Sequence, residues 1–315
     1  MLLLDAPIVD AADNFPLVDL DTAPSDATAL KVVSALRNSG FLLIKSSNLP
    51  LELQKKAIAA ASHILELQSS STVVTHPTDP KIYAMLHGVD FYMDCSANAT
   101  MISDLREWYT ALRQTKDTLL SCIAKGLGIS NDNFFVDLHS ENNDSLRLLR
   151  YLPGDEDTGN RCKEHSDYGT LTLLLTDGVG GLEAFVDEEW RPVPYIKGAL
   201  VVNIGSILSL WTRDELKATL HRVAGPSSVG STTPKGALLR AVNVPRTSLA
   251  YFADPNSEVS TAINSTDEKE LAGSIEMTVS EYIRWRSGGG DADRSGIAFT
   301  ATEEDRLSKI KSLNE

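Results

Sequence analysis

The first half of the chain repeats its hydrophobic residues mostly with the period of a helix. In the segment 27–37 apolar residues recur every three or four positions, which predicts an amphipathic helix. Gly40 follows this segment, and glycine tolerates the left-handed conformation in which many helices end. The same pattern predicts helices over about 51–67 and 103–128, with short strands at 15–20 and 41–44 and a loop at 69–80.

The pattern changes after residue 145, where short apolar runs are separated by Gly, Pro, Asp or Asn. The runs are LRLLRYL, GTLTLLLT, GLEAFV, ALVVNIG, HRVAG, ALLRAV and RTSLAYFA. Many short strands at close spacing are typical of a β-barrel or a double-sheet jelly roll. The segment 226–236 is predicted to be a loop, and 279–286 a helix.

These patterns predict an α+β fold with a mainly β core. We expect one domain over residues 1–315, with a helical N-terminal flank at about 1–145 and a jelly-roll core at about 146–256. A helical tail is expected at about 257–315, with a glycine-rich spacer at 287–290 and a charged, helix-prone end.

Composition narrows the class of protein. Hydrophobic residues make up 42% of the 315 residues and charged residues 23%, as in ordinary globular proteins. The formal net charge of −14 repels phosphate backbones, so nucleic acid is not an expected partner. No apolar run is long enough to predict a membrane helix, and the N-terminus lacks the basic region of a signal peptide.

The three cysteines form no CxxC pair, and an odd number cannot be fully paired within one chain. This favours a reducing compartment, so we expect a cytoplasmic protein.

A candidate metal site begins at His165 and Asp167. Residues two apart in an extended chain point to the same face, so the imidazole and the carboxylate can converge on one ion. His221 follows after 53 intervening residues and begins a strand-like run. Two nitrogens and one carboxylate oxygen leave coordination positions open, which suits iron(II) oxygenases. An isolated HxD pair is more often a surface hydrogen bond, but here it leads into an apolar strand.

In this context the sequence resembles the isopenicillin N synthase-like family of iron(II)/2-oxoglutarate oxygenases. The resemblance covers about residues 15–285 and includes FPLVDL, ALRNSGFLLI, AKGLGI, HSDYGTLTLLL and PRTSLAYFADPN. It implies a double-stranded β-helix in which His165, Asp167 and His221 hold iron(II). These three residues are therefore also the expected catalytic centre.

Arg246 and Ser248 match the RxS motif of this family. A guanidinium can bind a carboxylate through two parallel hydrogen bonds, and a hydroxyl two residues later shares its face. The resemblance implies that Arg246 and Ser248 bind 2-oxoglutarate and that Tyr151 assists, although a core tyrosine is the alternative for Tyr151. Two departures from the family pattern are Leu149, where asparagine is frequent, and Ser206, where aspartate is frequent.

The implied activity is oxidation of a small-molecule metabolite with iron(II), 2-oxoglutarate and O2, releasing succinate and CO2, as in secondary metabolism. Hydroxylation, desaturation and ring closure all remain open. So do an iron-dependent oxidase that does not use 2-oxoglutarate and an inactive metal-binding module. A zinc hydrolase is disfavoured because HExxH is absent. The sequence does not determine the oligomeric state. Candidate pocket residues, each also compatible with the core or the surface, are Tyr83, Phe91, Arg147, Arg161 and Phe252.

Overall fold

A computed structural model of the chain describes residues 14–20, 25–67, 73–76, 79–87, 99–261 and 277–286. Its helices are α1 (Asp26–Asn38), α2 (Leu51–Leu67), α3 (Ala99–Gly126), α4 (Phe134–Asp137), α5 (Ser206–Trp211), α6 (Lys235–Val242) and α8 (Val279–Arg286). Its strands are β1 (Leu17–Asp19), β2 (Phe41–Lys45), β3 (Val73–Thr75), β4 (Lys81–His87), β5 (Ser145–Tyr151), β6 (Cys162–His165), β7 (Leu171–Thr176), β8 (Leu182–Val186), β9 (Glu189–Pro192), β10 (Leu200–Ile204), β11 (His221–Val223) and β12 (Arg246–Ala253).

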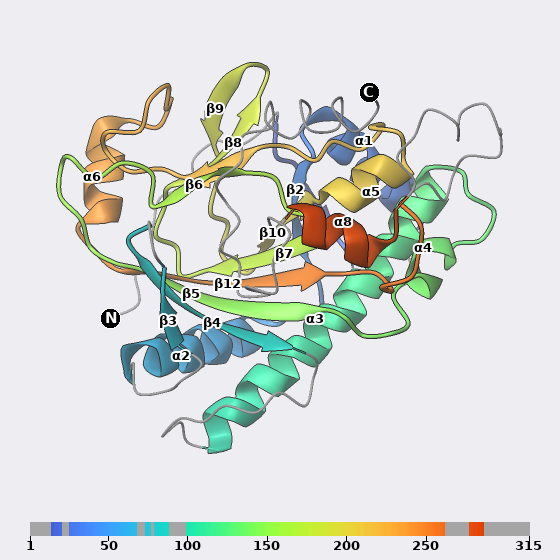
Figure 1. Cartoon of the computed structure of the whole chain (residues 1–315), viewed down its shortest axis with the longest axis horizontal. Helices are drawn as coiled ribbons and strands as arrows, with labels where there is room; N and C mark the ends of the chain where they lie inside the picture. The colour runs from blue at the N-terminus through green and yellow to red at the C-terminus, as the bar shows by residue number, and fades with distance from the viewer. Residues whose placement is uncertain are drawn as a thin grey trace.

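The strands form two sheets. The large sheet has the order β1-β2-β10-β7-β12-β5-β4-β3, and the small sheet has the order β6-β11-β8-β9. Within the large sheet only β1 and β2 pair in parallel, and the other neighbours are antiparallel. Figure 1 shows α2 and α3 along the face of the large sheet that points away from the small sheet. This mainly β core with helices confirms the predicted fold class at that level.

Side-chain alternation in the central strands separates a core from a cavity. Successive residues of a strand point to opposite faces. On β5, Leu146 and Leu148 pack in the main hydrophobic core, whereas Arg147, Leu149 and Tyr151 line an internal cavity. Both faces of this strand are therefore largely buried, which explains why its sequence shows no simple polar and apolar alternation.

The first helix matches its prediction closely. The hydroxyl oxygen of Ser25 accepts a hydrogen bond from the backbone N–H of Thr28 and caps the start of α1. Gly40 has a φ of 71° after the helix end, and a Cβ at this position would lie 2.1 Å from the carbonyl oxygen of Lys217. A side chain at residue 40 would therefore be strained by the backbone and would also collide with a neighbouring segment.

The predicted strand ALLRAV is wrong, because these residues lie in helix α6. The helix begins after Pro234 and buries Leu238, Ala241 and Val242, which lie on one side of it. A short apolar run fits either a buried strand or a buried helix, so its length did not decide between them.

The N-terminal part contributes more strands than the sequence pattern indicated. Strand β3 lies inside the predicted loop at 69–80, and β4 pairs with β5 over its whole length. The large sheet therefore extends beyond the expected 146–256 core. The spacer at 287–290, the charged C-terminal end and Phe91 lie outside the described residues. None of the helices described here combines the length and the apolar character needed to cross a membrane.

Candidate active site

Two paired strands bring the predicted histidines together. His165 ends β6 and His221 begins β11, and the two residues are partners in the antiparallel register. Their ring centroids are 4.3 Å apart. Side chains of directly opposed residues lie on the same face of a sheet, so this register points both imidazoles in one direction.

Asp167 completes the triad from the turn after β6. Its Oδ1 lies 3.7 Å from Nε2 of His165 and 3.7 Å from Nε2 of His221. Among the described residues these three form the one group of His, Cys, Asp or Glu side chains whose ligand atoms converge, all within 4.8 Å of one another. The donor set and its spacing fit an iron(II) ion.

Hydrogen bonds orient each of the three side chains. Nδ1 of His165 donates to the carbonyl oxygen of Lys163 (2.7 Å), and Nδ1 of His221 donates to that of Thr219 (3.2 Å). Each ring therefore carries its lone pair on Nε2, the atom that faces Asp167. Oδ2 of Asp167 accepts from Thr172 Oγ1 (2.5 Å) and Asn203 Nδ2 (2.7 Å), which leaves Oδ1 directed at the histidines.

The charge states also suit a divalent cation. Burial, followed by the neighbouring His221, lowers the pKa of His165 to about 3, so the imidazole is neutral at physiological pH. For Asp167, burial opposes ionisation, but His221, His165 and the hydrogen bonds from Thr172 and Asn203 outweigh it and lower the pKa. A neutral imidazole and a carboxylate are the forms that bind metal.

The predicted carboxylate clamp lies on the large sheet. Arg246 and Ser248 are on β12 and Tyr151 is the register partner of Arg246 on β5. The Arg246 side chain donates from Nη1 to Ser248 Oγ (3.2 Å) and from Nε to the carbonyl oxygen of Val179 (3.0 Å). Its guanidinium carbon is 5.0 Å from the centroid of the Tyr151 ring.

Arg246 is only 1% exposed, and no carboxylate of the described residues forms an ion pair with it. The Asp177 carboxylate interacts with Arg246 only at longer range, and a buried cation without a direct ion pair favours binding of an anion. Arg246 is therefore suited to bind a carboxylate ligand.

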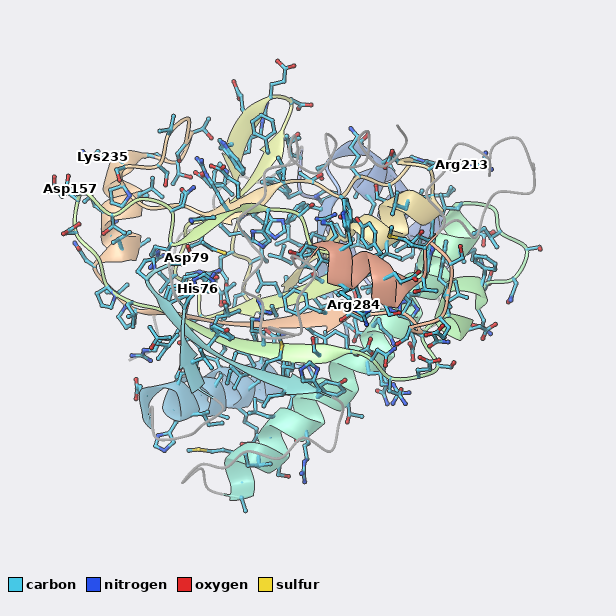
Figure 2. The ribbon with its side chains drawn as sticks, in the orientation of Figure 1. His76, Asp79, Asp157, Arg213, Lys235 and Arg284 are labelled. Atoms are coloured by element: carbon cyan, nitrogen blue, oxygen red, sulfur yellow. The ribbon has the colours of Figure 1, made fainter. Side chains whose placement is uncertain are left out.

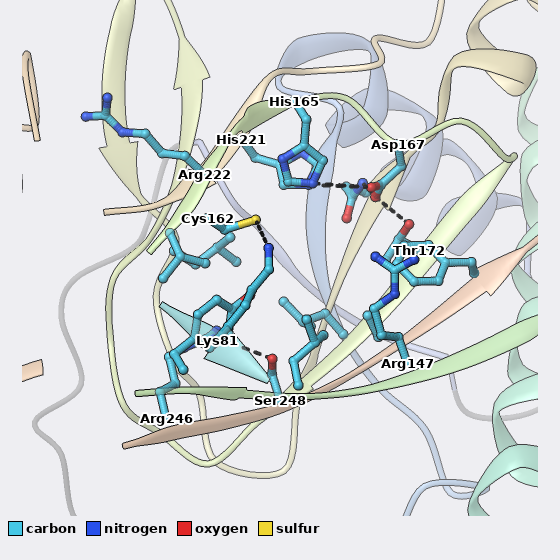
Figure 3. A pocket seen from close by; sticks show the side chains of 18 of the residues that line it. Lys81, Arg147, Cys162, His165, Asp167, Thr172, His221, Arg222, Arg246 and Ser248 are labelled. Carbon is cyan, nitrogen blue, oxygen red and sulfur yellow. Dashed lines mark hydrogen bonds and ion pairs between the residues drawn. The ribbon is translucent and has the colours of Figure 1, made fainter. Parts of the chain in front are cut away.

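One cavity joins both sites. It is lined by all six predicted site residues, and its volume is about 60 Å³. Figure 3 shows His165, His221 and Asp167 at one end and Arg246 with Ser248 at the other. A small molecule with a metal-binding end and a carboxylate end fits this arrangement.

Of the four described residues that the sequence suggested for the substrate pocket, two line the cavity and two do not. Arg147 and Phe252 line the cavity. The ring centroid of Tyr83 lies 5.5 Å from the Arg147 guanidinium carbon, but Tyr83 does not line the cavity. Arg161 does not line the cavity either; its guanidinium carbon lies 5.6 Å from the centroid of the Tyr151 ring, and it donates to the carbonyl oxygens of Ala241 and Gly180. Sequence reasoning missed Lys81, a cavity-lining lysine on β4.

Hydrogen bonds from helix α8 and from Ser206 hold the segment that contains Ser166 and Asp167. Ser206, at the position where the family frequently has aspartate, donates from N (2.8 Å) and from Oγ (2.9 Å) to the carbonyl oxygen of Asp167. Arg286 of α8 donates to Ser206 Oγ (2.9 Å) and to Ser166 Oγ (3.1 Å). Because Ser166 lies between two ligands, Arg286 restrains the triad without touching it.

We therefore expect Arg286→Met to weaken iron(II) binding by roughly tenfold or more, the usual effect of removing an outer support of a metal ligand. Equilibrium dialysis against iron(II) under anaerobic conditions measures this. Arg284→Met is the matched control, because Arg284 is on the same helix but exposed (Figure 2). Equal iron affinities for the two variants would contradict the role of Arg286.

The chain is also similar in sequence to known iron(II)/2-oxoglutarate oxygenases. Residues 143–255 match the model of the 2OG-Fe(II) oxygenase superfamily. The chain is 35% identical over 195 residues to a proline hydroxylase, buaE, of Petromyces alliaceus, covering 58% of this chain and 57% of the relative. It is 34% identical over 163 residues to a 2-oxoglutarate-Fe(II) type oxidoreductase, ppzD, of Metarhizium rileyi, covering 48% and 42%. The chain thus spans about half the length of these curated relatives.

Among solved structures, a full-length Neurospora crassa protein in complex with alpha-KG and 5-formyluracil has a similar fold. The TM-score is 0.72 at 22% identity, and the match covers 86% of this chain and 95% of the other. At this identity the likeness establishes the fold alone.

Proposed function

We propose that the chain is a 2-oxoglutarate-dependent dioxygenase that oxidises a small-molecule metabolite, and the match of residues 143–255 to the 2OG-Fe(II) oxygenase superfamily supports this proposal. The strongest support is that one cavity has the iron-type triad at one end and the buried Arg246 at the other. The matching relatives include a proline hydroxylase and an oxidoreductase of the 2-oxoglutarate-Fe(II) type, which supports a small metabolite as the substrate.

His165, Asp167 and His221 are proposed to hold iron(II), with Nε2, Oδ1 and Nε2 as the ligand atoms. Iron supplies the activation of O2, which is coupled to conversion of 2-oxoglutarate to succinate and CO2. Thr172 and Asn203 keep Asp167 ionised and oriented. The carbonyl oxygens of Lys163 and Thr219 fix the tautomers of the two imidazoles.

Arg246 and Ser248 are proposed to bind the C5 carboxylate of 2-oxoglutarate. Tyr151 packs against the guanidinium and limits its movement. The apolar side chains of Leu149 and Leu174 on the cavity wall exclude water from the bound co-substrate. These contacts leave 2-oxoglutarate oriented with its 2-oxo acid end toward the triad.

Arg147 is proposed to contact the primary substrate. It lines the same cavity, is only 8% exposed, and its guanidinium carbon lies 5.3 Å from the centroid of the Phe252 ring. A guanidinium held between aromatic rings keeps a defined orientation for a polar substrate group. Hydroxylation, desaturation and ring closure are all compatible with this placement.

We also assign residues 1–315 to one domain with a double-stranded β-helix core flanked by N-terminal helices, supported by the eight-stranded and four-stranded sheets. The cytoplasm remains the predicted location and rests on the cysteine content.

The activity is tested by aerobic incubation of the iron(II)-loaded protein with 2-oxoglutarate and a panel of small acids, amino acids and heterocycles. We expect succinate to form only when iron(II), O2 and 2-oxoglutarate are all present. Consumption of O2 with a panel compound in the absence of 2-oxoglutarate would instead establish the direct oxidase. Asp167→Ala is the control for metal-independent background.

A further inference from the structure

Three neighbouring strands place a row of polar residues across one wall of the cavity. Lys81 on β4 is the register partner of Tyr151 on β5, and Tyr151 is the partner of Arg246 on β12. Their exposures are 2%, 4% and 1%, yet all three line the cavity. The row thus contains two buried cations separated by one aromatic ring.

Lys81 lines the same cavity as the triad and the Arg246–Ser248 pair. Figure 3 shows the Lys81 side chain rising from β4 so that its tip lies between the triad and the Arg246–Ser248 pair, next to Cys162. A ligand that occupies this cavity therefore lies near a further cationic side chain besides Arg246 and Arg147. The contacts of Nζ include Asp79 Oδ2 (2.9 Å) and Cys162 Sγ (3.1 Å).

A lysine ammonium has three donors, and a thiol is a weak acceptor. A carboxylate oxygen of a ligand can therefore replace Cys162 as the partner of Lys81 at little cost while Asp79 keeps its contact. Asp79 is itself held in place, because its backbone N–H donates to Nδ1 of His76 (3.0 Å). Figure 2 shows His76 and Asp79 close together near β3 and β4.

Lys81 keeps its charge in this setting. Burial alone lowers the pKa of the lysine, but Cys162, Tyr151 and Asp79 outweigh burial and raise it above the usual value. The ammonium is already desolvated before a ligand arrives, so a bound carboxylate gains its attraction without a new desolvation cost for the lysine.

We propose that Lys81 is a second cationic contact for the C5 carboxylate of the co-substrate, beside Arg246, and that it makes the site selective for 2-oxo dicarboxylates over 2-oxo monocarboxylates. The inference rests on the proposed function. Selectivity for the dicarboxylate would then depend on β4 as well as on the RxS motif of β12, and Lys81 and Arg246 would both contact the C5 carboxylate.

The test compares binding of 2-oxoglutarate and of 2-oxovalerate, which has the same carbon chain but no second carboxylate. Dissociation constants are measured anaerobically on iron(II)-loaded protein by calorimetry. The main variant is Lys81→Met with Asp79→Asn, since removing both partners avoids leaving a buried charge unpaired. We expect roughly tenfold or greater weakening for 2-oxoglutarate and little change for 2-oxovalerate.

A matched control exists elsewhere in the fold. Lys116 and Asp144 form a buried ion pair in which Nζ and Oδ2 are 3.0 Å apart, and neither residue lines the cavity. Lys116→Met with Asp144→Asn should leave the preference for the dicarboxylate unchanged. Lys81→Arg, which keeps the charge, should stay close to the wild type. If the double variant does not fold, Lys81→Gln with Asp79 retained provides the same comparison.

Unchanged 2-oxoglutarate affinity in the variants that remove the Lys81 charge would overturn the proposal. Equal weakening for both oxo acids would also overturn it, because a purely structural role affects the two alike. Failure of the wild-type protein to bind 2-oxoglutarate at all would instead refute the proposed function. The two failures are therefore distinguishable.

Discussion

Replacing His221 by alanine is expected to abolish turnover while leaving the fold largely intact. The imidazole supplies one of the three ligand atoms, and the two that remain cannot hold iron(II) with the same affinity or geometry. Removing a residue that only hydrogen-bonds to a metal ligand already lowers metal affinity by roughly ten- to a hundredfold. Removing a ligand itself should therefore lower iron(II) affinity by at least about a hundredfold. Succinate release and anaerobic iron binding measure the two effects separately.

The fold should survive this change because the His221 ring faces the cavity and packs edge-on against Phe41, with 5.6 Å between ring centroids. Circular dichroism and thermal unfolding check this point. His63→Ala, which replaces an exposed histidine of α2, is the control and should behave as the wild type. Wild-type activity in His221→Ala would remove the basis for the metal assignment.

Replacing Arg246 by alanine is expected to raise the KM for 2-oxoglutarate sharply. Removing one partner of a buried charge pair costs about 2–5 kcal/mol, which corresponds to a roughly thirtyfold or larger loss of affinity. The loss should concern the co-substrate and not the metal, because Arg246 and the triad lie at opposite ends of the cavity (Figure 3). Succinate release at increasing 2-oxoglutarate concentrations measures the KM.

Arg150→Ala is the matched control for this experiment. Arg150 is on β5, next to Tyr151, but its side chain points to the other face and pairs with the exposed Glu66 at 2.9 Å. Surface pairs of this kind contribute little, so the KM should be unchanged. If Arg246→Ala also leaves the KM unchanged, the carboxylate is bound elsewhere in the cavity.

The residues that carry the proposed chemistry could be predicted because their spacing reflects local geometry. His165 and Asp167 are two apart, as are Arg246 and Ser248, and such pairs share one face of an extended chain. His221 is a candidate as a second histidine downstream. The resemblance to a known family then implies its role as a ligand and the roles of Arg246, Ser248 and Tyr151. The structure places all of these side chains around one cavity.

Contacts that depend on long-range pairing were beyond the sequence pattern. Lys81 reaches the cavity only because β4 pairs with β5, and nothing local predicts that a lysine at this position is buried. Arg286 supports Ser166 from a helix that lies 120 positions away in the chain. In both cases the tertiary pairing of elements, and not the local sequence, determines the environment of the charge.

One cavity is proposed to bind iron(II) and 2-oxoglutarate together. The most direct test of this is an anaerobic titration of the iron(II)-loaded protein with 2-oxoglutarate, followed by visible absorption. We predict that the weak charge-transfer band of an iron(II)–2-oxo acid chelate appears and saturates at one equivalent per chain. Absence of this band from protein with iron shown to be bound would contradict the account and favour the oxidase that does not use 2-oxoglutarate.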